Sequence, residues 1–209
     1  GRKSCTRRIV KGFIPNDAKW GYTAFTPKGC ISCRGTFADG YGEKFFKLPC
    51  EPRDILYVRE TWERFECWNC EGDESGSCPK EPQKSVLDKV CGCYMYRATD
   101  EISGDAKWHP SIRMPKEAAR IWLKVTDVRV ERLQKITEDG CIAEGIYPSN
   151  CRGCNATFGC DACPDEGYNE VDGFADLWNS TIKKSDLDRY SWDANPWVWV
   201  IGFERCEKP

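Results

Sequence analysis

The strongest fold signal in this sequence is the segment Ile121-Trp122-Leu123-Lys124-Val125-Thr126-Asp127-Val128-Arg129-Val130. It is rich in β-branched residues, and apolar and polar side chains partly alternate along it, so it predicts a long β-strand. Thr137 then has the character of a helix N-cap, because Glu138 and Asp139 follow in the first turn and Gly145 provides a stop. We therefore expect a strand followed by a short helix.

Further elements are predicted on both sides of this centre. Residues 54–59, 94–98 and 197–203 have the composition of strands, and an amphipathic helix is expected from about Val171 to Ile182. Strands outnumber helices, and two short helices lie between strands. The sequence thus predicts an α+β fold built on a small mixed β-barrel. In the first 50 residues, four glycines are expected to mark turns: Gly29, Gly35, Gly40 and Gly42.

Composition restricts the class of protein. The 209 residues suit a single domain over 1–209 with insertions, and 9 Trp, 8 Tyr and 9 Phe suffice for a core. The net charge of -2 argues against a global field that draws the protein onto nucleic acid or membranes. No apolar run approaches the roughly 18 residues of a membrane span, and no signal peptide is visible. Because the chain begins at Gly1 without Met, we expect a processed chain or a fragment that lacks its true start.

Cysteine is unusually abundant, at 15 residues. A secreted disulfide framework favours short chains and an even number of cysteines, whereas this chain is long and its count is odd. Many of the cysteines form CxxC pairs, which suit tetrahedral thiolate sites better than long-range cross-links. We therefore favour structural zinc over disulfides and expect a reducing cytoplasm.

Two sets of cysteines are candidates for zinc. The first is made of two CxxC pairs separated by five residues, and four thiolates would close the coordination sphere and make the site structural. Its residues are Cys151, Cys154, Cys160 and Cys163. An iron–sulfur cluster or free cysteines are the alternatives. The second set is Cys67, Cys70, Cys91 and Cys93, in which Cys78 could replace any one member. These sets define Cys-rich insertions at about 64–93 and 147–170.

The other cysteines and the single histidine are assigned no chemistry. Cys30 and Cys33 form a CxxC pair without a neighbouring partner pair, so we interpret them as ordinary thiols. His109 is interpreted as a loop residue, because no nucleophile motif accompanies it. The remaining cysteines are expected to behave as small apolar residues: Cys5, Cys50, Cys141 and Cys206.

The start of the chain is the most basic local stretch, with no acidic residue among 1–11. In an extended segment Lys3 and Arg7 share one face, and Thr6 and Arg8 share the other; in a turn, Lys3 and Thr6 would converge instead. The functional interpretation is an anion or carbonyl site in which Lys3 polarises or deprotonates and Thr6 donates a hydroxyl. The alternative is a solvated basic terminus.

Four segments, spread from end to end of the chain, carry a family resemblance. They are Gly1-Arg2-Lys3-Ser4-Cys5-Thr6-Arg7-Arg8, Asp54-Ile55-Leu56-Tyr57-Val58-Arg59-Glu60-Thr61-Trp62, residues 110–121, and Asn195-Pro196-Trp197-Val198-Trp199-Val200-Ile201. In this order they resemble the ASCH domain family, which has a PUA-like β-barrel, and most of all its phage and prophage members, some labelled morphogenetic proteins. Two departures are that Ser4 stands where the family usually has Thr, and that no strand and short helix precede the Gly-Arg-Lys block.

The resemblance implies a cleft that holds a nucleotide or an RNA base. The small bacterial acetylcytidine amidohydrolases of this family use a Lys, a Thr three residues later and a Glu on a later helix. These map onto Lys3 as general base, Thr6 as nucleophile and Glu144 as an acid/base or orienting group. Arg8 would brace an oxyanion or a phosphate.

Ligand contacts are also expected from Arg59, Glu60, Trp62 and Trp197. The alternative is that Arg59 and Glu60 pair within the barrel wall and that the tryptophans pack as ordinary barrel aromatics. The resulting hypothesis is a nucleotide- or RNA-binding ASCH-like protein of the bacterial host cytoplasm, with amide hydrolysis on a modified nucleoside as its catalytic form. A non-catalytic RNA-binding module and a phage assembly factor with a phage protein partner are the alternatives.

Overall fold

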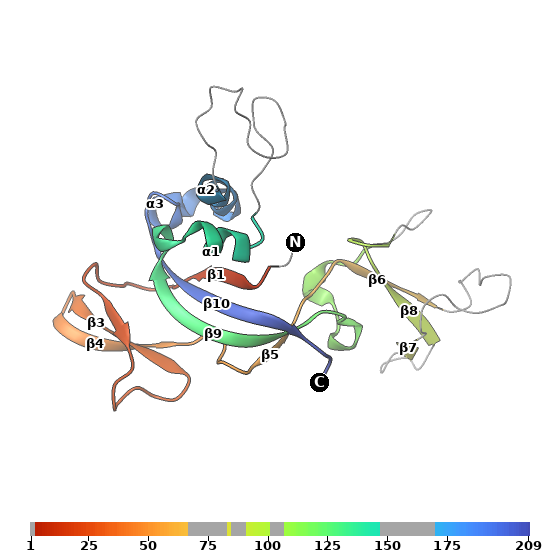
Figure 1. Ribbon diagram of the computed structural model, residues 1–209, viewed down its shortest axis with the longest axis horizontal. Helices are drawn as coiled ribbons and strands as arrows, with labels where there is room; N and C mark the ends of the chain where they lie inside the picture. The colour runs from red at the N-terminus through yellow and green to blue at the C-terminus, as the bar shows by residue number, and fades with distance from the viewer. Residues whose placement is uncertain (1–2, 67–82, 85–90, 101–106, 147–169) are drawn as a thin grey trace, which may run out of the picture. The chain divides into compact units, whose positions relative to one another are not determined.

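The computed structural model describes residues 3–66, 83–84, 91–100, 107–146 and 170–209. These residues form mostly antiparallel strands and a few short helices (Figure 1), so the predicted α+β class is confirmed. A PUA-like barrel stays a prediction. The chain separates into two compact units, Gly1–Ile55 with Lys124–Glu204, and Leu56–Leu123 with Arg205–Pro209. Within the described ranges, no helix combines the length and apolar character needed to cross a bilayer.

Two sheets carry the strands of the first unit. The four-stranded sheet has the order β1-β10-β9-β5, from strands β1 (Cys5–Ile9), β10 (Trp197–Cys206), β9 (Trp122–Arg132) and β5 (Ile55–Tyr57). The three-stranded sheet has the order β2-β3-β4, from strands β2 (Lys19–Gly21), β3 (Cys30–Phe37) and β4 (Gly40–Lys47). The strands expected at 54–59, 121–130 and 197–203 are therefore confirmed.

The helices of the first unit cover one face of the β1–β10 pair (Figure 1). They are α1 (Glu138–Ala143), α2 (Glu170–Thr181) and α3 (Leu187–Tyr190), with 3-10 turns at Leu133–Lys135 and Lys184–Asp186. Because side chains alternate along β1 and β10, one side chain in two enters the core that the helices cover. This core contains Cys5, Leu133, Ile136, Cys141, Phe174, Trp178, Val198 and Val200.

The sequence signals around α1 fix both of its ends. The side chain of Thr137 accepts a hydrogen bond from the backbone N–H of Gly140 at 3.2 Å, as an N-cap does. At the other end Gly145 has a φ of 87°, and its N–H donates to the carbonyl of Ile142. The N–H of Ile146 donates to the carbonyl of Cys141, which completes a Schellman motif. The predicted N-cap and glycine stop are confirmed.

The glycines of the first 50 residues do not all mark turns. Gly29 and Gly40 have positive φ angles and lie where strands begin, as expected. Gly35 and Gly42, however, lie inside β3 and β4 and face each other across the pair, so their assignment to turns was wrong. A Cβ on Gly35 would lie 3.1 Å from Pro15, which shows that glycine is needed there for close approach rather than for turning.

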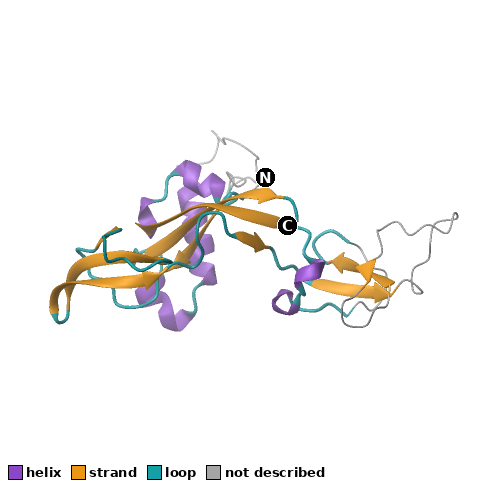
Figure 2. Ribbon diagram, turned by 90° about the horizontal axis from the view of Figure 1, so that it is seen from below, coloured by secondary structure: helices purple, strands orange, loops and turns teal. Residues whose placement is uncertain are grey.

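The second unit contains a sheet of order β6-β8-β7, whose strands are drawn in orange in Figure 2. These strands are β6 (Trp62–Glu66), β8 (Cys91–Tyr96) and β7 (Gln83–Lys84), and 3-10 turns follow at Ser111–Arg113 and Lys116–Ala118. The predicted strand at 94–98 is thus confirmed in part, since β8 begins earlier and ends at Tyr96. The core of this unit contains Tyr94, Tyr96, Met114, Ala118, Ala119 and Trp122.

Candidate functional site

The start of β1 meets the end of α1 in a compact cluster of charges. The Nζ of Lys3 donates to Oε2 of Glu144 at 2.7 Å, and an NH1 group of Arg7 donates to Oε1 at 3.3 Å. The second guanidinium nitrogen of Arg7 lies 3.9 Å from a carboxylate oxygen of Glu131. We call Lys3, Arg7, Glu131 and Glu144 the Glu144 cluster. It joins residues separated by 141 positions in the sequence.

Backbone contacts hold this cluster in place. The N–H of Ser4 donates to the carbonyl of Ala143 at 2.8 Å, which fastens the start of β1 to the last turn of α1. Arg7 lies opposite Val200 of β10, so its side chain enters the face that the helices cover. Its guanidinium carbon lies 5.9 Å from the ring centroid of Phe174 on α2. The position of the cluster therefore follows from the packing of β1, α1, β10 and α2.

Burial separates the members of the cluster into two groups. The side chains of Arg7 and Glu144 are only 4% and 5% exposed, whereas that of Lys3 is 46% exposed. Buried charges are tolerated when they are paired, as these two are. Lys3 is therefore the member whose ammonium group a ligand can reach, and Glu144 fixes where that group stands.

Thr6 and Arg8 lie on the opposite face of β1. Thr6 is paired with Ile201 and Arg8 with Trp199, and their side chains alternate with that of Arg7. The hydroxyl oxygen of Thr6 is buried and has no hydrogen-bond partner among the described residues. Of the three predicted catalytic residues, the structure thus brings Lys3 and Glu144 into contact and directs Thr6 away from them. Arg8 is exposed and donates to the carbonyl of Arg7 at 3.0 Å.

Trp197 belongs to an aromatic group on this same face of β10. The ring of Trp20 lies 5.8 Å from that of Trp197 and 6.2 Å from that of Trp199, both edge to face. The guanidinium carbon of Arg132 lies 4.5 Å from the ring centroid of Trp197. The ring of Trp197, which was expected to contact a ligand, therefore already contacts two side chains of its own unit.

The other predicted ligand contacts lie in the second unit and have structural partners. Arg59 donates to the carbonyl of Ile112 and to the hydroxyl of Tyr57, at 3.0 and 3.1 Å. Glu60 accepts two hydrogen bonds from Arg120, at 2.6 and 2.8 Å, so it does not form the pair with Arg59 that was considered as an alternative.

Trp62 and His109 pack on each other in the same unit. Their ring centroids are 5.0 Å apart, and their backbones form an isolated antiparallel bridge. Trp62 also meets Tyr94 edge to face at 5.7 Å. These contacts account for both residues by packing, which was the alternative considered for Trp62; His109, expected in a loop, forms a β-bridge instead.

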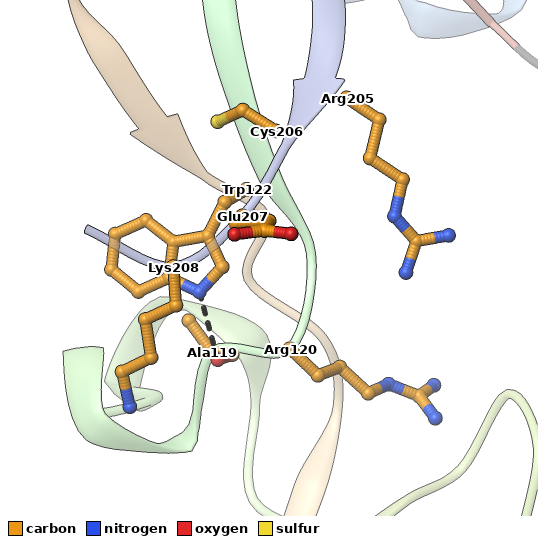
Figure 3. A pocket seen from close by; sticks show the side chains of 7 residues that line it. All are labelled: Ala119, Arg120, Trp122, Arg205, Cys206, Glu207 and Lys208. Carbon is orange, nitrogen blue, oxygen red and sulfur yellow. Dashed lines mark hydrogen bonds between the residues drawn. The ribbon is translucent and has the colours of Figure 1, made fainter.

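A shallow cavity of about 410 Å³ also lies in the second unit (Figure 3). The indole N–H of Trp122 donates to the carbonyl of Ala119 at its base, at 3.1 Å. Arg120 contributes to the rim but is committed to Glu60. No feature of the sequence had indicated this cavity. It is lined by Ala119, Arg120, Trp122, Arg205, Cys206, Glu207 and Lys208.

Most of the predicted zinc ligands lie outside the described residues. These are Cys67, Cys70, Cys151, Cys154, Cys160 and Cys163, together with the alternative Cys78. Cys91 and Cys93 lie in β8, and Cys93 is buried. In the part of the chain that the structure describes, no group of three or more His, Cys, Asp or Glu residues is arranged to hold a metal. Zinc stays a prediction.

The cysteines expected to behave as small apolar residues do so in the first unit. Cys5, Cys50 and Cys141 are buried free thiols, whereas Cys206, in the second unit, is only partly buried. Cys33, which was expected to be an ordinary thiol, is buried as well. Burial raises the pKa of Cys33 and that of Cys141 to about 11, so neither is a nucleophile at neutral pH. The buried thiols are therefore core residues.

Comparisons with protein-family models, with curated proteins and with solved structures found no match for this chain. The resemblance to the ASCH family stays a prediction, and function has to be argued from the residues themselves.

A strong asymmetry of charge was missed in the sequence. The first 53 residues carry 11 Lys and Arg but 4 Asp and Glu, a net charge of +7. The remaining residues carry 20 Lys and Arg but 29 Asp and Glu, a net charge of -9. The two net charges nearly cancel in the total of -2, so they become visible only when charge is summed segment by segment along the chain. The basic part contains β1 and the whole β2-β3-β4 sheet.

Proposed function

We propose that this chain binds RNA or a nucleotide through its basic first quarter, residues 1–53. The observation that carries the proposal is the net charge of +7 in this segment of a protein whose total is -2. Phosphates are attracted to clustered Lys and Arg, and this attraction supplies most of the sequence-independent affinity for nucleic acid. The net negative charge of the remaining residues disfavours phosphate elsewhere and so helps to select the basic segment.

The Glu144 cluster supports this function by fixing a cation at the start of β1. Lys3 is half exposed, and its ammonium group is anchored by a carboxylate that Arg7 also neutralises. Arg8 and Lys11 are exposed a few residues further along. A cation that the fold already holds in place loses less conformational entropy on binding a phosphate than one on a flexible terminus does.

The test is the affinity for a fluorescently labelled single-stranded RNA at low salt, measured by anisotropy. The variant Arg8→Gln/Lys11→Gln should bind several-fold more weakly than the wild type, and to a similar degree for all sequences. The control Lys183→Gln/Lys184→Gln removes the same charge from exposed residues outside the basic segment. An equal loss of affinity in the two variants would contradict the proposal.

Hydrolysis of an amide on a modified nucleoside is the second candidate. It is favoured by the 2.7 Å contact between Lys3 and Glu144, which fits a lysine that acts next to an orienting carboxylate. It requires Thr6 as the nucleophile, and the side chain of Thr6 lies on the other face of β1. Binding is therefore the better-supported function.

A panel of acetylated cytidines distinguishes the two candidates. If the chain is an amidohydrolase, the wild type releases acetate, and Lys3→Ala and Thr6→Val both abolish the release while leaving the thermal unfolding curve in place. If release is absent from the wild type while RNA still binds, the catalytic assignment fails and the binding function remains.

A further inference from the structure

Exposed aromatic side chains are confined to one part of the described residues. All of them lie between residues 13 and 45, inside the basic segment, and they are between 41% and 83% exposed. Single exposed apolar side chains are ordinary on protein surfaces, but several that gather on one face indicate an interaction site. The exposed aromatic side chains are Phe13, Tyr22, Phe25, Tyr41 and Phe45.

Two of these rings lie on one face of the β2-β3-β4 sheet. Tyr41 is paired with Thr36, and Phe45 with Ser32, so these four side chains point to the same side. The other side carries Ile31, Cys33 and Phe37, which are buried. We call the exposed side the outer face. By register it carries Lys19, Gly21, Cys30, Ser32, Arg34, Thr36, Tyr41, Glu43, Phe45 and Lys47.

Small residues leave the ring of Phe45 accessible. Its neighbour across the pair, Ser32, is small and only 1% exposed, and beyond it lies Gly21 on β2. A Cβ placed on Gly21 would meet no atom within 4 Å, so the surface is open above Gly21, on the far side of Ser32 from the ring. A flat group can therefore lie beside Phe45 above the sheet.

Cations lie beside the rings. Arg34 of β3 is paired with Lys19 of β2 and with Glu43 of β4. Lys47 follows Phe45 on the outer face of β4. The acidic residue that the register places on the outer face, Glu43, accepts a hydrogen bond from the hydroxyl of Ser32. The carboxylate of Asp17 also contacts this face, where it accepts a hydrogen bond from the hydroxyl of Thr36 at 2.8 Å. The face thus offers two separated rings and three cations against two carboxylates that are both engaged in hydrogen bonds.

We propose that the outer face binds single-stranded nucleic acid, with bases stacked on Tyr41 and Phe45 and phosphates held by Lys19, Arg34 and Lys47. This inference rests on the proposed function and deepens it by naming the surface and the form of the ligand. Stacking requires bases that are not already paired, which selects single strands over duplexes. A second copy of the chain is disfavoured, because it would bring two segments of charge +7 together.

The test compares affinities for labelled oligouridine RNA and for an RNA duplex. Tyr41→Ala and Phe45→Ala should each weaken oligouridine binding roughly 5- to 150-fold and change duplex binding less. Tyr41→Phe keeps the ring and should retain the affinity. Gly21→Glu, which has room for a side chain, should weaken binding by placing a negative charge on the outer face.

Matched controls are Ile112→Ala and Leu177→Ala, which remove exposed apolar side chains outside the basic segment. Both should bind like the wild type, and all variants should unfold within a few degrees of it. Unchanged oligouridine affinity in both alanine variants overturns the inference. It leaves the proposed function standing if Arg8→Gln/Lys11→Gln still weakens binding, whereas a wild type that binds no RNA defeats both. A wild-type dimer that Tyr41→Ala dissociates, with RNA affinity unchanged, also overturns it.

Discussion

At the scale of single residues, the Glu144 cluster is held together by buried charge. Arg7 and Glu144 are almost fully buried, and their desolvation is compensated by the ion pair between them, together with Lys3 on Glu144 and Glu131 on Arg7. The Nε of Arg7 has no hydrogen-bond partner within the described residues, so this guanidinium depends on its contacts with the two carboxylates. Loss of the carboxylate charge would leave a buried cation without its closest partner.

Glu144→Gln is therefore expected to lower the free energy of unfolding by about 3 kcal/mol. The control Glu204→Gln has the same change of atoms in an exposed ion pair with Lys124, and should cost less than about 1 kcal/mol. Urea denaturation of the two variants and the wild type measures both values. An equal loss of unfolding free energy in the two variants would mean that burial of the Glu144 ion pairs does not add to their effect on stability.

The buried thiols should make the free energy of unfolding fall as the pH rises above 9. Burial, with a smaller contribution from Asp17, raises the pKa of Cys33 from about 9 to about 11. The folded state thus holds this proton more tightly than the unfolded state does, and the resulting stability is complete below pH 9 and is lost as the pH rises towards 11. We expect Cys33→Ala to be less stable at pH 8 but to lose less stability between pH 8 and pH 10.5.

Urea denaturation at these two pH values measures that difference. Cys30→Ala is the matched control, since it removes the same atoms from a partly buried thiol on the same strand. The account of Cys33 fails if Cys33→Ala and the wild type lose the same free energy between the two pH values.

At the scale of elements, local signals predicted α1, α2, β9 and β10 well. Each has a signal within its own residues, such as the Thr137 cap or the β-branched run that became β9. The strands β2, β3 and β4 were not predicted, because their stability comes from pairing between segments and because Gly35 and Gly42 resemble turn residues. The outer face was missed for a related reason, since Phe45 and Phe46 differ only in the side to which the strand directs them.

The candidate site was predictable only in part. Strand alternation in the sequence grouped Lys3 with Arg7 and Thr6 with Arg8, and the contacts of Lys3 and Arg7 with Glu144 agree with it. Only the family resemblance indicated Glu144 as a candidate. No local sequence pattern could have linked it to Lys3, because the two residues are 141 positions apart. What the resemblance could not supply is the direction of Thr6, which depends on the register of β1 against β10.

Gly145 sets the end of α1 and thereby the position of Glu144. With a φ of 87°, Gly145→Ala should cost about 1 kcal/mol of stability through backbone strain. The added Cβ would lie 3.5 Å from the Cβ of Lys3, an ordinary contact, so strain is the cause. Gly21→Ala, in open space, should change stability by less than about 0.5 kcal/mol. Thermal unfolding of both variants checks the difference, and a Gly145→Ala protein as stable as Gly21→Ala would contradict it.

At the scale of the whole molecule, charge is divided along the chain. The first 53 residues and the remainder differ by sixteen charges, although the total is close to neutral. Such a distribution steers a polyanion towards one segment and away from the other, and the effect is screened by salt. The function proposed for this protein depends on that division more than on any single side chain.

The most direct test of RNA binding by the basic segment is the salt dependence of the affinity of the wild-type protein for single-stranded RNA. With four or more phosphate contacts, the logarithm of the association constant should fall linearly with the logarithm of the salt concentration, with a slope of about -3 or steeper. A slope near zero, or no binding at low salt, would contradict the claim that this basic segment binds RNA.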